Sequence, residues 1–339
     1  MKISKIGLLT STALLFSSLL TIPTAALATS SSTTSEETTW DKPMFVAGAG
    51  LTAAQLNETM NLLNITATDV DTEVATAQDL INYLGTGSGD DSAMLSSVVV
   101  TKEASGSGIQ VDIVTPANIT LITAEQYMNP LVTAGITDTS IEVASVVQVT
   151  GESALTGVYK AFEAHGVTID PDRAQLAQEE LTTTTDIADE ITSEASQDST
   201  LSSEEQSAAD EAYQTQLNQA LVDIKTELAA LKEAQGDNVT AEDVENVVNQ
   251  ALKDNDLSQY ISQDSINQLI ALAQKYLDTD GVLSQESLDQ LQKISDSFKD
   301  TLSQLGDQFG GLTDALKANE GFFQNLWTSV KDFFTNLFN

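Results

Sequence analysis

The apolar residues of this 339-residue chain follow two different spacings, and the change between them constrains the fold more than any other feature. Before residue 167, short Val- and Ile-rich runs such as TSIEVASVVQV at 139–149 alternate with short helical patterns. After it, apolar residues recur every three or four positions, which is typical of amphipathic helices. The sequence therefore predicts an α+β fold: an N-terminal mixed α/β sheet domain at 43–166, then an all-α helical domain at 167–310.

The first part alternates strands and helices, which implies a mixed sheet with helices packed on it. Strands are expected at 43–47, 68–76, 94–103, 109–115 and 140–149, and helices at 52–63, 77–84, 124–134 and 152–165. The strands at 94–103 and 109–115 flank the segment ASGSG, so they are predicted to pair as a hairpin. Pro130 is expected to kink or split the helix at 124–134.

The second part is predicted to be a helical bundle or an extended helical array. Asp170 and Pro171 open a helix that Thr182–Thr185 should weaken, and a polar linker is expected near 192–202. Later helix starts are indicated by capping residues before each apolar repeat, namely Ser203, Thr240, Ser262 and Ser284. Because each helix is amphipathic, each needs a partner surface.

The start of the chain predicts export. Lys2 and Lys5 precede an apolar run, and Ala26-Leu27-Ala28 has the pattern of a signal-peptidase site, so residues 1–28 are expected to be a cleaved signal peptide. Residues 29–42 then form a disordered leader. The chain has no cysteine, which excludes disulfides and thiolate chemistry and fits secretion by a Gram-positive bacterium.

The formal net charge is −36. A chain this acidic repels phosphate backbones, so no nucleic-acid partner is expected. The charge is best explained as a source of solubility outside the cell.

One loop resembles half of a calcium site. With Gly281 at position 6 of an EF-hand loop, Asp280 and Asp278 fall at positions 5 and 3, and Glu286 lies one place before position 12. Tyr276 stands at position 1, so the match is incomplete. Asp278, Asp280 and Glu286 are the metal-ligand candidates, and the alternative is a plain turn between two helices; no other cofactor is expected.

Other motifs favour structural explanations. Val149–Gly157 lacks the Lys of a phosphate-binding loop, and the glycines of Gly48–Gly50, with Asp69, Asp71 and Glu73 downstream, match a dinucleotide loop only weakly. His165, the one histidine, ends a helix, where it suits the helix dipole. The 50 acidic residues leave a carboxylate-pair hydrolase open without singling out a pair, so the catalytic residues are unknown.

Several segments resemble a known family. They are Tyr127, LVTAGI at 131–136, VTGESALTGVYK at 149–160 and EEL at 179–181, with GAGLTAAQ at 48–55. These segments resemble the secreted proteins of low-GC Gram-positive bacteria grouped as domain-of-unknown-function family 1002. The resemblance spans roughly 43–280 and implies an exported two-part protein; it brings no reaction, cofactor or catalytic residue. Gly50 stands where an acidic residue is expected.

The C-terminal segment GFFQNLWTSVKDFFTNLFN is predicted to form an amphipathic aromatic helix within 311–339. Its apolar face comprises Phe322, Phe323, Leu326, Trp327, Val330, Phe333, Phe334, Leu337 and Phe338. This face can pack on the protein or on a second copy, or it can lie in a membrane interface, where Trp and Phe are favoured. Lys331 is its one cation, so electrostatic attraction to anionic lipid would add little to binding.

Three functions stay open on the sequence alone. The first is a non-enzymatic secreted protein, either released or retained at the cell surface through the C-terminal helix. The second is a carboxylate-dependent hydrolase of cell-wall polymer. The third is calcium-dependent folding or adhesion.

Overall fold

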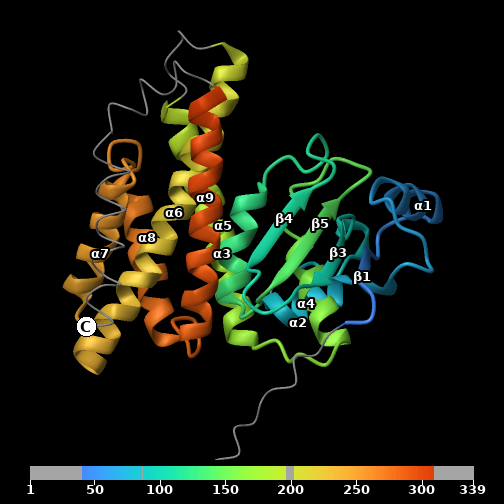
Figure 1. The fold of residues 1–339 in the computed structure, drawn as a ribbon, viewed down its shortest axis with the longest axis horizontal. Helices are drawn as coiled ribbons and strands as arrows, with labels where there is room; N and C mark the ends of the chain where they lie inside the picture. The colour runs from blue at the N-terminus through green and yellow to red at the C-terminus, as the bar shows by residue number, and fades with distance from the viewer. Residues whose placement is uncertain (1–39, 86, 196–201, 309–339) are drawn as a thin grey trace, which may run out of the picture. The chain divides into compact units, whose positions relative to one another are not determined.

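The computed structural model of the protein describes residues 40–85, 87–195 and 202–308. They belong to one compact unit that begins at Thr38. In the described residues a sheet with its helices comes first and long helices follow, so the predicted α+β class is confirmed (Figure 1). The predicted signal peptide, nearly all of the leader and the C-terminal aromatic helix lie outside the described residues.

The described strands form one mixed five-stranded sheet in the order β2-β1-β3-β5-β4. They are β1 (Met44–Gly48), β2 (Asp71–Ala75), β3 (Ser97–Lys102), β4 (Ile109–Ile113) and β5 (Thr139–Ala144). β1 pairs parallel with β2 and antiparallel with β3. β5 pairs antiparallel with β3 and parallel with β4. The strand expected at 140–149 is therefore shorter than predicted, and Val149 makes only an isolated bridge to Ile119.

The predicted hairpin between β3 and β4 is wrong, because β5 lies between these strands. Their connecting loop does not make a tight turn; it wraps around Asp138, which directly precedes β5. Oδ1 of Asp138 accepts hydrogen bonds from the backbone nitrogens of Gly106 (3.1 Å) and Gly108 (2.9 Å). The same oxygen accepts a bond from Nε2 of Gln290 at 3.0 Å. β5, which comes later in the chain, thus lies between β3 and β4, and the local sequence of β3 and β4 does not indicate this pairing.

The helices of the first part lie close to their predicted ranges. They are α1 (Ala53–Leu62), α2 (Ala77–Leu84), α3 (Ala124–Thr133) and α4 (Ala154–Ala164), with a 3-10 turn at Asp91–Ala93. Thr52 and Thr123 form capping boxes at α1 and α3. The expected split at Pro130 does not occur: α3 is continuous, and Ala134 N donates to Pro130 O at 2.9 Å. Residues 126–133 are all buried, and their packing outweighs the lost hydrogen bond.

The helices of the second part are α5 (Pro171–Ala195), α6 (Ser203–Gln235), α7 (Ala241–Asp254), α8 (Gln263–Asp278) and α9 (Gln285–Gln308), with a 3-10 turn at Gly236–Asn238. Thr240 and Ser262 cap α7 and α8 as predicted. α5 does not weaken at Thr182–Thr185. Thr184 and Thr185 are buried, and Thr184 Oγ1 donates to Glu180 O at 2.8 Å. Tertiary packing therefore overrides the low helix propensity of threonine.

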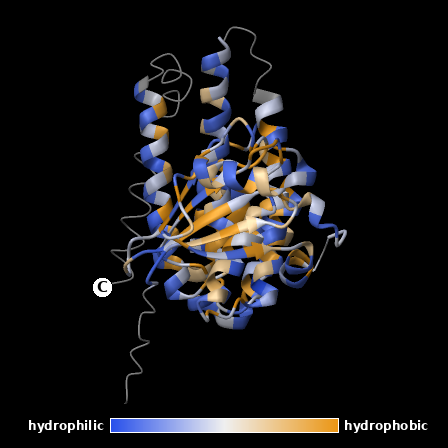
Figure 2. Ribbon diagram, turned by 90° about the vertical axis from the view of Figure 1, so that its right-hand side faces the viewer, coloured by the Kyte–Doolittle hydropathy of each residue, from blue (hydrophilic) through white to orange (hydrophobic). Residues whose placement is uncertain are grey.

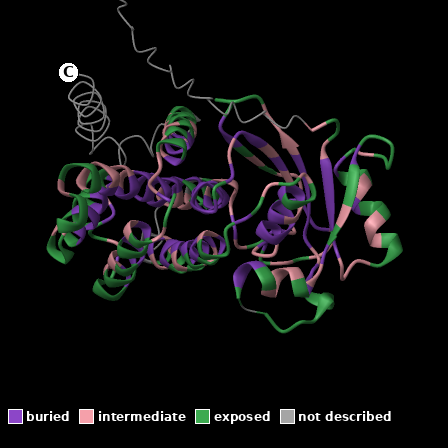
Figure 3. Ribbon diagram, turned by 90° about the horizontal axis from the view of Figure 1, so that it is seen from below, coloured by how far each residue is buried: buried purple, intermediate pink, exposed green. Residues whose placement is uncertain are grey.

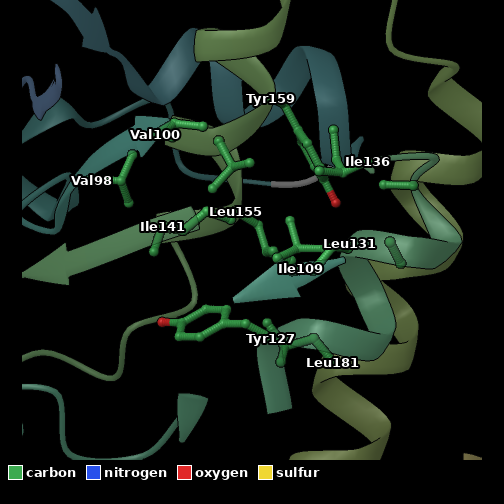
Figure 4. Close-up of a cluster of buried hydrophobic side chains, with 14 of the residues drawn as sticks. Val98, Val100, Ile109, Tyr127, Leu131, Ile136, Ile141, Leu155, Tyr159 and Leu181 are labelled. Atoms are coloured by element: carbon green, nitrogen blue, oxygen red, sulfur yellow. The ribbon is translucent and has the colours of Figure 1, made fainter. Parts of the chain in front are cut away.

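The core of the sheet is completed by helices of both parts. Val98, Val100 and Ile141 of the sheet pack with Leu131 of α3 and Leu155 of α4 (Figure 4). The same cluster contains residues of α5, α6 and α9, namely Ala174, Ala177, Leu181, Val222, Leu291, Ile294 and Phe298. α1 covers part of the opposite sheet face, over Phe45, Ala47 and Val99.

A second core lies among α5, α6, α7 and α8, around residues such as Leu221, Leu228, Val248, Leu269 and Tyr276. The central strands and the inward helix faces carry many of the apolar residues (Figure 2) and are largely buried (Figure 3). Among the described helices, none combines the length and hydropathy that a membrane span requires.

Candidate functional site

A surface pocket of about 440 Å³ lies between the start of α5 and the end of α8. Its lining is mostly acidic: Asp170, Asp172, Gln175, Leu176, Glu179, Lys275, Asp278, Thr279 and Asp280. Lys275 and Glu179 form an ion pair in its wall. Oδ1 of Asp170 accepts the backbone N–H groups of Asp172 (2.9 Å) and Arg173 (3.2 Å), which caps α5 as the sequence predicts.

Two of the three calcium candidates line this pocket. Asp278 ends α8 and Asp280 follows it, whereas Glu286 lies in the first turn of α9 and is not part of the lining. In the described part of the chain, no three Asp, Glu, His or Cys side chains lie together as a metal site would require. Gly281, which lies between Asp280 and Glu286 in the sequence, has φ +80° and sits against Arg173. Calcium binding at this turn stays a prediction from the sequence.

A group of fully buried polar side chains lies where α3, α5, α6 and α8 meet. Lys225 Nζ is 2.7 Å from Glu180 Oε1, and the two side chains are 1% and 0% exposed. Thr133 Oγ1 donates to the other oxygen, Glu180 Oε2, at 2.6 Å. Lys225 Nζ also lies 3.3 Å from Asn129 Oδ1 and 4.9 Å from the ring centre of Tyr276.

Burial dominates the electrostatics of this polar network. It lowers the pKa of Lys225, an effect that neighbouring Glu180 partly offsets. Burial also raises the pKa of Tyr276 well above its ordinary value. Removing one member of a buried ion pair costs roughly 3–5 kcal/mol, because the other charge is left uncompensated. The network therefore ties the sheet part to the helical part.

The sequence analysis missed this network, although a signal was present. Lys225 lies one residue after Ile224 on a helix whose apolar residues include Leu221 and Leu228. Glu180 sits beside Leu181. A charged side chain next to the buried stripe of an amphipathic helix can reach solvent along the protein surface. The pattern alone therefore does not show that two such side chains meet in the interior.

The segments that resemble the known family make structural contacts. The Tyr127 hydroxyl donates to Gly151 O at 2.6 Å. A Cβ on Gly157 would lie 2.8 Å from Val98 Cγ2, so glycine lets α4 approach the sheet. Lys160 pairs with Asp79 at 2.8 Å. These contacts explain Val149–Gly157 as a packing motif.

The other motifs also have packing contacts. A Cβ on Gly48 would lie 2.2 Å from Met94 O, so the end of β1 passes close to another backbone segment. Asp71 and Glu73 lie in β2. The ring of His165 stacks on Trp40 at 3.7 Å between centroids, and its Nδ1 is 2.9 Å from Ala161 O.

One carboxylate pair stands out on the sheet. Asp112 of β4 and Glu142 of β5 are register partners, so their side chains lie on the same face. This is the face that carries Val99, part of which α1 covers. Partial burial, and then the negative charge of Asp112, raise the pKa of Glu142.

A mixed sheet whose core is completed by a following set of long helices defines the chain as an α+β protein, and its sheet part and helical part share one buried cluster. The family described as "Protein of unknown function (DUF1002)" matches residues 47–294, and the chain belongs to this family. The family resemblance seen in the sequence is thereby confirmed.

One curated relative is an uncharacterized protein, YpuA, of Bacillus subtilis (strain 168). It is 33% identical over 151 residues, which cover 43% of this chain and 51% of YpuA. The chain thus aligns with only about half of this relative. No solved structure matches the chain.

Proposed function

We propose that this protein is an exported interaction protein of the cell envelope, and that its C-terminal aromatic segment binds an apolar surface there. The signal-like start of the sequence supports export, as does the family resemblance. The observation that carries the proposal is a contrast in apolar surface. In the described residues, Leu62 (42%) and Val74 (45%) are the large apolar side chains that stand exposed.

The C-terminal segment differs from this well-buried body. Its sequence gathers Phe, Trp, Leu and Val on one face of a helix. Leu62 and Val74 offer little area to such a face, so a surface outside the described body is the better partner. The segment is rich in Phe and contains Trp327, which suits the membrane interface.

The test compares the full chain with a variant that lacks residues 311–339. Binding is measured by co-sedimentation with phosphatidylcholine vesicles, and folding by the melting temperature. The proposal expects that deletion abolishes vesicle binding and leaves the melting temperature unchanged. A lower melting temperature with no effect on vesicle binding would mean that the segment packs on the protein, and would overturn the proposal.

A matched pair of variants separates the two faces of the segment. Trp327→Ser with Phe334→Ser alters the predicted apolar face, and Asn325→Ala with Ser329→Ala alters the polar face. The first pair should reduce vesicle binding and the second should not. Equal loss in both pairs would contradict an oriented helix at the interface.

A second candidate is hydrolysis of wall polymer, favoured by the Asp112–Glu142 pair and the raised pKa of Glu142. Purified protein is incubated with peptidoglycan and teichoic acid, and released fragments are measured. Release that Glu142→Gln abolishes, while Gln110→Glu on the same face leaves it intact, would favour the enzyme over the interaction protein. Absence of any release would remove this candidate.

A further inference from the structure

The buried network around Lys225 places an amine, a carboxamide and a carboxylate side by side. Lys225, Asn129 and Glu180 come from three different helices and are all essentially unexposed. A fully buried Lys–Glu pair is costly to desolvate, and an exposed pair would hold helices together at less cost. The arrangement therefore calls for an explanation beyond a simple ion pair.

The amide group of Asn129 is oriented toward the amine. Its Nδ2 donates to Asn218 O at 2.9 Å, which turns Oδ1 toward Lys225. Lys225 Nζ lies 3.3 Å from that oxygen and 3.4 Å from the backbone oxygen of Asn129. The nucleophilic nitrogen is thus held against the carboxamide whose carbon it could attack.

Glu180 is placed to take the proton of the amine. Its Oε1 lies 2.7 Å from Lys225 Nζ, and its Oε2 accepts the Thr133 hydroxyl at 2.6 Å, which fixes the carboxylate. Burial lowers the pKa of Lys225, which favours the neutral amine. The Tyr276 ring, 4.9 Å from Nζ, forms an aromatic wall beside the amine.

We propose that Lys225 and Asn129 join in an intramolecular amide bond, with Glu180 as the proton acceptor. Glu180 removes a proton from the Lys225 ammonium, and the free amine attacks Cγ of Asn129. The Cγ–Nδ2 bond then breaks, the second amine proton leaves with that nitrogen, and ammonia is released. The products are a secondary amide, ammonia and a protonated Glu180; charge is conserved, and no oxidant or other reactant is consumed.

Formation of the amide removes the two buried charges and, with them, the desolvation penalty of the ion pair. After the reaction Lys225 is neutral as an amide and the proton it lost neutralises Glu180, so no buried charge remains in the pair. The bond joins α3 to α6 across 96 positions of sequence. It gives a chain without cysteine a covalent link between its sheet part and its helical part.

Peptide mapping of the full-length protein tests the proposal. Trypsin should release residues 103–160 joined to 174–232, with no cleavage after Lys225 and a mass about 17 Da below the sum of the two peptides, the mass of one ammonia. The linked ion should account for most of the protein. Separate peptides 103–160 and 174–225 at their full masses would overturn the proposal.

Variants test the role of Glu180. Glu180→Gln removes the proton acceptor and should yield separate peptides, whereas Glu179→Gln, at the neighbouring exposed ion pair, should leave the link intact. A folded Glu180→Gln protein, judged by near-ultraviolet circular dichroism, that still carries the link would refute this role. If Glu180→Gln does not fold, Glu180→Asp replaces it: the shortened carboxylate should slow linkage during refolding at least tenfold, and an unchanged rate would refute the role.

Discussion

At the scale of single residues, one partly buried carboxyl of the helical part contributes to how stability depends on pH. Asp223 of α6 accepts hydrogen bonds from Gln219 Nε2 and Asn255 Nδ2, both at 2.8 Å. Burial nevertheless raises the pKa of its carboxyl to about 6, against the action of these two bonds. The surroundings of Asp223 in the folded protein therefore disfavour the ionised carboxylate.

The raised pKa of Asp223 predicts a loss of stability as the pH rises. Between about pH 4 and pH 6 the folded protein keeps a proton that the unfolded chain has released, so the free energy of unfolding falls across this window. The loss is at most about 3 kcal/mol for a shift of about two units. Asp223→Asn cannot ionise and should flatten this part of the profile, although it also loses one of the two hydrogen bonds that the carboxylate accepts. Urea unfolding at pH 4.5 and pH 7 measures it.

The control for this prediction is Asp237→Asn, which removes one negative charge at an exposed position in the turn after α6. It should keep the pH dependence of the parent protein. If Asp223→Asn and Asp237→Asn give the same profile, the effect belongs to net charge and not to the partly buried carboxyl of Asp223.

At the scale of elements, local signals were predictable and pairings were not. The starts of α1, α3, α7 and α8 follow from Thr52, Thr123, Thr240 and Ser262, because a cap bonds to groups within its own first turn. The order of β3, β5 and β4 could not be predicted, because it depends on a strand that arrives after α3.

The candidate sites divide in the same way. The sequence brought Asp278 and Asp280 together because they are near neighbours, and both line the pocket. It could not bring Asn129 to Lys225, since that meeting requires the packing of α3 against α6. Short-range patterns thus identify caps and loops, while the enclosed chemistry comes from tertiary packing.

The close approach of α4 to the sheet depends on a glycine. Gly157 lies inside α4, where alanine would normally stabilise a helix by about 1 kcal/mol. Here a Cβ would lie 2.8 Å from Val98 Cγ2, in a fully buried position. Gly157→Ala should therefore destabilise the protein by roughly 1–3 kcal/mol, as overpacking does. The measurement is the urea midpoint.

Gly306→Ala in α9 is the matched control, because a Cβ there meets no atom of the described residues within 4 Å. It should be neutral or stabilise the protein by up to about 1 kcal/mol. Stabilisation by both substitutions would show that α4 can move away from the sheet without cost.

At the scale of the whole molecule, the main core of the sheet is formed in part by side chains of the helical part. Leu181 of α5, Val222 of α6, and Ile294 and Phe298 of α9 belong to the same buried cluster as Val98 of β3. Each such side chain contributes about 1.5–3 kcal/mol when it is fully buried. Together they approach the entire free energy of unfolding of an ordinary domain, about 5–15 kcal/mol.

This shared core predicts that residues 40–166, which hold all the described strands, will not fold alone. Without α5, α6 and α9 the fragment leaves one side of α3 uncovered, so it should show no cooperative thermal transition and no near-ultraviolet circular dichroism. The fragment 40–308 keeps the whole cluster and should unfold in a single transition. A cooperative transition in 40–166 would mean that the sheet part is an independent domain. The helices would then be an addition to the sheet's core and not its completion.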